Sequence, residues 1–223
     1  MIFDILKDGL DYVGTNRNQI ILYYLGILLF PLVLIEAYSY HIIENCLKGM
    51  INNKDELPDF TVNSKSFIKG LKLLVLKIIY FLPEIIIFIF LINFKSLDFY
   101  ITTLLIIILT VFSYYLSQIA SICMVESDSF REGFNLSKIT DTLKSVGLTY
   151  IELIIATFVI ILGIIGVTIV VAGFLIFLSN ISTVLFTILS LLIIIAYIAL
   201  LIVIIPIYVL FKYRTIVSIY NLK

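Results

Sequence analysis

Long runs of apolar residues separated by short polar stretches dominate the chain. A helix needs about 20 apolar residues to cross the roughly 30 Å hydrocarbon core of a bilayer, so runs with few charges indicate membrane spans. The longest run, Leu153 to Phe211, carries no charge, is too long for one helix and contains one polar cluster at 179–183. The runs are continuously apolar rather than alternating, which favours helices over barrel strands. The pattern predicts five spans, near residues 20–43, 71–93, 99–124, 150–178 and 184–211.

The composition is that of a membrane protein rather than of a water-soluble domain. Of the 223 residues, 62% are hydrophobic and 13% are charged, whereas soluble domains average about 45–50% apolar and about 25% charged residues. The 15 basic residues equal the 15 acidic ones in number, so nothing favours nucleic acid as a partner. We therefore expect an all-α polytopic transmembrane helical bundle, a single integral membrane domain over residues 1–223 whose surroundings are the lipid bilayer.

The positions of Lys and Arg predict which side of the membrane each loop occupies. Basic residues gather in cytoplasmic loops. If residues 44–70, residues 125–149 and the C-terminal end are placed on one side, together with Lys72 and Lys77, that side holds 12 of the 15 basic residues. The two loops and the C-terminus are therefore expected to be cytoplasmic, in a multi-pass protein of the cell membrane.

The N-terminal segment leaves two topologies open. With five spans the N-terminus lies outside, yet residues 1–19 have apolar positions at helical spacing among charges, which is typical of a cytoplasmic amphipathic helix. Pro31 lies within the first apolar run, so a second interpretation is a re-entrant or broken hairpin that returns to the same side. We favour a true span.

Each of the two long loops contains an amphipathic segment. In the first, Ser64 is expected to cap a helix with one apolar face, formed by Phe67, Ile68, Leu71 and Leu74. In the second, apolar residues recur at three- and four-residue spacing: Phe130, Phe134, Leu136, Ile139, Leu143 and Val146. Such segments can lie as interfacial helices in the headgroup plane, as a surface for lipid or for a cytoplasmic partner. The preferred interpretation is that they simply lead into the next span.

The two amphipathic segments also resemble each other. Ser64-Lys65 and Leu71-Lys72 are echoed by Ser137-Lys138 and Leu143-Lys144, and each set leads into a two-span hairpin. This predicts two parallel repeats, residues 58–124 and 130–211, that start and end in the cytoplasm. Parallel repeats of this kind relate the halves of some transporters.

Several short motifs resemble those of a known family. They are Asp55-Glu56-Leu57-Pro58-Asp59-Phe60, Gly70-Leu71-Lys72, Tyr80-Phe81-Leu82-Pro83 and Phe130-Arg131-Glu132-Gly133-Phe134. In these motifs the chain resembles a family of small archaeal membrane proteins common in methanogens, a domain of unknown function (number four-zero-one-three). The resemblance implies a multi-pass plasma-membrane protein of an archaeon, with no catalytic residue to carry over. The chain departs from the family near Phe60, where family members often have a Trp, because it contains no Trp.

Two carboxylates inside expected spans are the candidate functional residues. Glu36 lies after Pro31 in the first span, and Glu84 follows Pro83 directly in the second. A proline in a helix frees a backbone carbonyl one turn earlier, and an ionisable group within a span marks a functional site or a buried partner. Each site thus has the composition of a proton- or cation-binding spot. The alternative is that Glu36 lies near the interface and that Glu84 is hydrogen-bonded or protonated within the bundle.

Small residues in the fourth span predict close helix packing. Gly163 and Gly166 lie one turn apart, and Gly173 follows seven residues after Gly166. Small residues let helices approach closely in membranes. The partner helix can belong to the same chain, which is the commoner case, or to another chain.

The sequence offers little support for other chemistry. His41 is the only histidine, and Cys46 and Cys123 have no metal-ligand spacing, so no metal, cofactor or disulfide is predicted. No catalytic motif is present, and we do not expect an enzyme. Two function classes remain: a non-enzymatic scaffold or interaction protein, and a small transporter or channel that uses Glu84. Protein partners, the oligomeric state and the glycosylation of Asn180 stay open.

Overall fold

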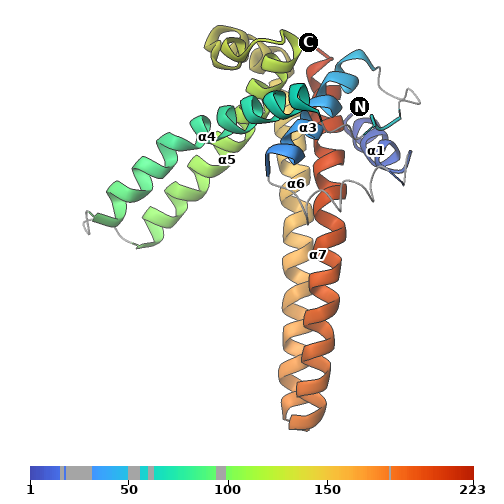
Figure 1. Cartoon of the computed structure of the whole chain (residues 1–223). Helices are drawn as coiled ribbons and strands as arrows, with labels where there is room; N and C mark the ends of the chain where they lie inside the picture. Colours follow the sequence, from blue (N-terminus) through green and yellow to red (C-terminus); the bar gives the residue numbers. More distant parts are fainter. Residues whose placement is uncertain (16–17, 19–31, 50–55, 60–62, 94–98, 181) are drawn as a thin grey trace.

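All the helices that the sequence predicts in the described part of the chain are present in the computed structural model, and no strand occurs there. The structure describes residues 1–15, 18, 32–49, 56–59, 63–93, 99–180 and 182–223. The elements are α1 (Ile2–Val13), α3 (Leu32–Lys48), α4 (Ser64–Asn93), α5 (Phe99–Glu126), the 3-10 turn η1 (Phe130–Phe134), α6 (Leu136–Ser179) and α7 (Thr183–Tyr220) (Figure 1).

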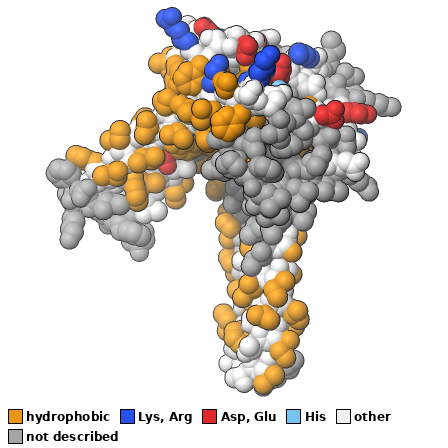
Figure 2. All heavy atoms as spheres, in the orientation of Figure 1, with side chains coloured by type: hydrophobic (Ala, Val, Ile, Leu, Met, Phe, Trp, Pro, Cys, Tyr) orange, Lys and Arg blue, Asp and Glu red, His pale blue; other side chains and the backbone are white. Residues whose placement is uncertain are grey.

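Two helical hairpins, α4–α5 and α6–α7, extend in different directions from a packed head (Figure 1). The head consists of α1, α3, η1, the first turns of α4 and α6 and the last turns of α5 and α7. The described hydrophobic residues that are buried lie in this head, and none lies between Lys77 and Gln118 or between Ile154 and Val209. The described apolar side chains of the outer parts of both hairpins are therefore partly or largely exposed (Figure 2).

Three described helical stretches are long and apolar enough to cross a membrane, as expected of a membrane protein: Ser64–Phe90, Ile101–Glu126 and Leu136–Phe177. A shorter apolar stretch, Phe186–Tyr197, lies in α7. The polar cluster at residues 179–183 forms the connection that the sequence predicts, since α6 ends at Ser179 and α7 begins at Thr183.

The two amphipathic segments continue without a break into the hairpins. α4 begins at Ser64 and α6 at Leu136, which confirms the interpretation that these segments lead into the apolar helices. The predicted cap of α4 is wrong by one residue. Asn63 is the cap, because its Oδ1 accepts a hydrogen bond from Ser66 N at 2.7 Å. Asn135 caps α6 in the same way, through Lys138 N at 3.2 Å, and asparagine is among the best N-cap residues.

The apolar faces of the two segments differ in what they contact. Phe67 and Ile68 of α4 are exposed, as an interfacial helix requires, whereas Ile139 and Val146 of α6 are buried in the head. Val146 packs near Tyr150 against the last turns of α7. The second segment is therefore part of the head core and does not present this face to lipid headgroups.

The N-terminal amphipathic helix packs against the last turns of α7. α1 buries Ile5, Asp8, Gly9 and Tyr12, and a Cβ at Gly9 would lie 2.6 Å from Thr215 Oγ1. Both chain termini thus lie at the head (Figure 1).

The favoured first span falls largely outside the described residues and stays a prediction. Pro31 and residues 19–30, which carry most of the predicted span, lie outside the described residues, and α3 is the 17-residue helix that follows them.

The glycines of the fourth span do not serve packing within the described chain. A Cβ placed at Gly163, Gly166 or Gly173 would meet no described atom within 4 Å. The structure therefore does not show these glycines in contact with another described helix of the same chain, which is the first of their two predicted uses.

Candidate functional site

The first predicted site residue, Glu36, lies in a polar cluster at the base of the hairpins. Lys77 of α4 donates to Oε2 of Glu36 on α3, and it also donates to the hydroxyl of Tyr213 on α7 at 2.6 Å. The side chains of Lys77 and Glu36 are 14% and 17% exposed. Buried charges are tolerated where they are paired, so this cluster joins three helices through one ammonium group.

A second cation lies beside this ion pair. Lys212 Nζ lies 4.3 Å from the ring centroid of Tyr213 and 5.5 Å from that of Tyr114 on α5. Lys77 Nζ lies 5.3 Å from the Tyr213 centroid. The Tyr213 ring thus contacts two ammonium groups, which are attracted to the face of an aromatic ring. We call Glu36, Lys77, Lys212, Tyr114 and Tyr213 the basal cluster.

The second predicted site residue, Glu84, lies deeper in the first hairpin, apart from the basal cluster. It follows Lys77 by seven residues, or about 10 Å along α4 at 1.5 Å per residue. Thr110 of α5 donates a hydrogen bond to Oε1 of Glu84. The other carboxylate oxygen, Oε2, is buried without a hydrogen-bond partner among the described residues. The structure therefore places the two predicted carboxylates in separate environments.

The sequence pattern does not predict a buried ion pair that the structure shows in the head. Arg214 of α7 donates through Nε to Asp8 Oδ2 at 2.8 Å and through Nη2 to Oδ1 at 3.3 Å. The side chains are 2% and 5% exposed, and Arg214 lies 5.0 Å above the ring of Tyr12. In the sequence, Arg214 stands out only as a basic residue of the C-terminal end. The one pattern that could have predicted a buried ion pair is the position of Asp8 on the apolar face of α1, between Ile5 and Tyr12.

A third charged group, Glu126, ties three helix ends together. Its carboxylate accepts bonds from Lys138 at 2.7 Å, from Lys223 at 3.3 Å and from the hydroxyl of Tyr220 at 2.7 Å. Nearby, Tyr40 donates to Asp128 Oδ1 at 2.6 Å. This hydrogen bond holds the pKa of the Asp128 carboxyl below its usual value because it stabilises the charged form.

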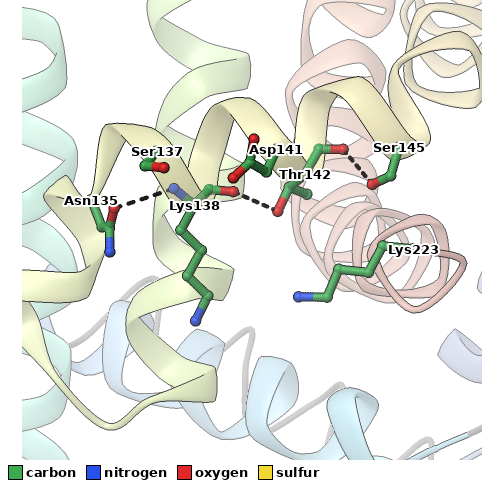
Figure 3. A pocket seen from close by; sticks show the side chains of 7 residues that line it. All are labelled: Asn135, Ser137, Lys138, Asp141, Thr142, Ser145 and Lys223. Atoms are coloured by element: carbon green, nitrogen blue, oxygen red, sulfur yellow. Dashed lines mark hydrogen bonds between the residues drawn. The ribbon is translucent and has the colours of Figure 1, made fainter.

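A hollow of about 490 Å³ lies beside these groups on the surface of the head (Figure 3). It is lined by Asn135, Ser137, Lys138, Asp141, Thr142, Ser145 and Lys223. Both lysines already pair with Glu126. The hydroxyls of Thr142 and Ser145 donate to backbone carbonyls of α6, each at 2.9 Å. These polar groups are therefore used within the fold.

The described residues offer no group suited to a metal ion. Within the described ranges, no three His, Cys, Asp or Glu residues come close enough to share one. His41 lies 3.0 Å from Ser66 Oγ through its Nε2, and Cys46 and Cys123 are buried free thiols. The arrangement places ionisable groups at two levels of the first hairpin, in the basal cluster and at Glu84.

The comparisons with known proteins bear on the region that contains both predicted carboxylates. A family model, DUF4013, described as a protein of unknown function, matches residues 20–177. The match covers Glu36, Lys77 and Glu84 and leaves out α1 and α7. Neither a curated protein nor a solved structure matches the chain. Since the matched region is more than half of the chain, it confirms the family that the short motifs indicated, and the chain belongs to the DUF4013 family of proteins of unknown function.

Proposed function

We propose that this chain is a multi-pass protein of the cell membrane that acts without catalysis, as an interaction protein whose hairpins offer apolar surfaces to other helices. The observation that carries this proposal is the exposure of the second hairpin, where no described hydrophobic residue from Ile154 to Val209 is buried. Large exposed apolar surfaces are typical of contacts with lipid or with other proteins. The sequence adds the lack of a catalytic motif, and its resemblance to methanogen proteins supports an archaeal origin.

The glycines of α6 favour a partner helix on one face. Gly166, Val170 and Gly173 are spaced four and three residues apart and so share a face of α6. Val170 is 71% exposed, and the two glycines have open space beside them. Since small residues allow close approach between helices in membranes, this face suits a helix from another molecule.

The proposed topology has four crossings, two for each hairpin, with the head in the cytoplasm. The 12 of 15 basic residues on one side of the expected arrangement support this orientation. The packing of α1 on α7 adds the N-terminus to the same side. The two hairpins then correspond to the predicted parallel repeats, residues 58–124 and 130–211, which stay a prediction.

Single-cysteine labelling tests this topology. We expect Asp4→Cys and Lys144→Cys to react with a membrane-impermeant maleimide from the cytoplasmic side alone, and Asn180→Cys from the external side alone. Asp4 and Lys144 are exposed in the head, and Asn180 lies at the tip of the second hairpin. The native Cys46 and Cys123 are buried, and the parent protein measures their background. Labelling of Asp4→Cys from the external side would contradict four crossings.

Disulfide cross-linking in native membranes tests the interaction surface. Val170→Cys is expected to form a cross-linked species under mild oxidation, because it lies between Gly166 and Gly173 on the proposed contact face. Thr168→Cys is the matched control, since two residues along a helix turn it to the opposite face. Mass spectrometry of the product identifies the second chain. Equal cross-linking at both positions, or none at position 170, would overturn the proposed surface.

A second candidate function is a small transporter or channel, which the environment of Glu84 favours. Glu84 carries one buried carboxylate oxygen with no partner among the described residues and one bonded to Thr110. Ionisable groups at membrane depth commonly mark ion or proton pathways. If the chain is an interaction protein, it should produce no proton or cation flux in proteoliposomes above that of empty vesicles. If it is a transporter, it should produce a flux that Glu84→Gln abolishes while membrane insertion stays intact.

A further inference from the structure

Where the two hairpins leave the head, side chains of α5, α6 and α7 line a narrow crevice. Its polar groups are the side chains of Tyr114, Tyr115, Thr157, Tyr208 and Lys212, and the rest of its wall is apolar. The space inside is about 10 Å³, which is room for about one water-sized group. A larger ligand therefore has room for little more than one of its atoms inside the crevice.

Lys212 lies at the level where the second hairpin enters its apolar region. The stretch from Leu153 to Phe211 carries no charge, and both of its end residues line the crevice beside Lys212. Lys212 is therefore the first charged residue of α7 on the head side of that stretch. The boundary between apolar and charged residues marks the level of the lipid headgroups in a membrane helix.

Among the described residues, no carboxylate lies within 4.0 Å of the ammonium group of Lys212. Glu36 pairs instead with Lys77, and Glu152 of α6 is exposed and makes no ion pair with Lys212. The basal cluster thus holds two cations and one carboxylate. A half-buried cation that shares its only nearby carboxylate with a second cation is unfavourable, and a bound anion relieves that cost.

We propose that the mouth of this crevice binds the phosphate group of an anionic phospholipid, with Lys212 as the cation that contacts the phosphate. The acyl chains of this lipid lie along the exposed apolar side chains of the two hairpins, such as Phe112 and Phe158. The surplus charge favours an anion, and the position at the headgroup level, between apolar helices, favours a lipid over a free ion. The proposal is independent of whether the hairpins bind partner helices.

Lipid binding to the full-length protein in detergent tests this site. Native mass spectrometry measures the affinity for phosphatidylglycerol, with phosphatidylcholine as the zwitterionic comparison and inorganic phosphate as the free ion. We expect Lys212→Gln to bind phosphatidylglycerol about tenfold more weakly, the loss expected for one charge-assisted hydrogen bond. Lys212→Arg should retain binding. Lys144→Gln, which removes an exposed lysine of the head, is the control and should bind like the parent.

Thermal unfolding separates lipid binding from a structural role of Lys212. Without lipid, Lys212→Gln and Lys212→Met are expected to be as stable as the parent or more stable, because they remove an unpaired cation. With phosphatidylglycerol the order should reverse, since the parent binds the lipid more tightly and gains more stability from it. Undiminished binding by both variants would overturn the proposal. So would an equal stabilisation of the parent by inorganic phosphate, which would make the site one for a free anion.

Discussion

Asp8→Ala is expected to lower the free energy of unfolding by roughly 3–5 kcal/mol, the cost of leaving a buried charge without its partner. Arg214 is 1% exposed, so water cannot replace the two bonds that Asp8 provides at 2.8 and 3.3 Å. For a chain of this length such a loss corresponds to a fall in Tm of roughly 10 °C. The helical circular dichroism signal of the protein in detergent, followed during heating, measures it.

A double-mutant cycle tests whether the loss comes from this pair. Asp8→Leu combined with Arg214→Met removes both charges and should recover most of the stability, because replacing a whole buried ion pair by apolar residues is often neutral. Asp141→Asn is the matched control. It breaks an exposed pair with Lys144 at 3.7 Å, with side chains 69% and 80% exposed, and should change stability by less than about 0.5 kcal/mol. A double variant no more stable than Asp8→Ala would show that the pair does not anchor α1.

Lys77→Met is expected to lower the free energy of unfolding by about 3 kcal/mol, again because it leaves a mostly buried carboxylate, Glu36, without its cation. It also removes the donor to Tyr213, so the hydrogen bonds that connect α4 to α3 and α7 at this point are lost. The stem of methionine keeps the packing of the lysine chain, which confines the change to the charge. Thermal unfolding in detergent measures the effect.

The same helix supplies the control for this variant. Lys72→Met makes the same substitution at an exposed residue of α4 and should be within about 0.5 kcal/mol of the parent. Glu36→Gln added to Lys77→Met should restore much of the stability, because it removes the uncompensated charge. If Lys77→Met and Lys72→Met have equal effects, the basal cluster contributes nothing specific to the fold.

The sequence predicts the hairpins well because their signal is local. An apolar run of sufficient length becomes a helix wherever it lies, and the polar cluster at residues 179–183 ends one helix and begins the next. The amphipathic starts of α4 and α6 follow from the same periodicity. Glu84 could likewise be found from the sequence, since a carboxylate inside an apolar run is easily recognised, and in the structure it accepts a hydrogen bond from Thr110.

The packing of the head and the pairing of its charges could not be predicted from local sequence patterns. Counting Lys77 and Arg214 together with the loop charges groups them on the head side of the apolar runs but says nothing of their partners. Arg214 pairs with a residue 206 positions away, and Lys77 with one 41 positions away. Pairing at such distances depends on how helices pack, which periodicity does not encode.

By itself, the sequence determined that this is an all-α membrane protein with two apolar hairpins, because hydrophobicity and helix length depend only on neighbouring residues. The tertiary structure decided that α1 packs on the end of α7, which puts both termini at the head. It also decided which charges are paired: Asp8 with Arg214 and Glu36 with Lys77, while no carboxylate of the described part of the chain lies in ion-pair contact with Lys212. The reason is that charge pairing in the head follows from contacts between helices far apart in the chain, and those contacts exist only once the helices have packed.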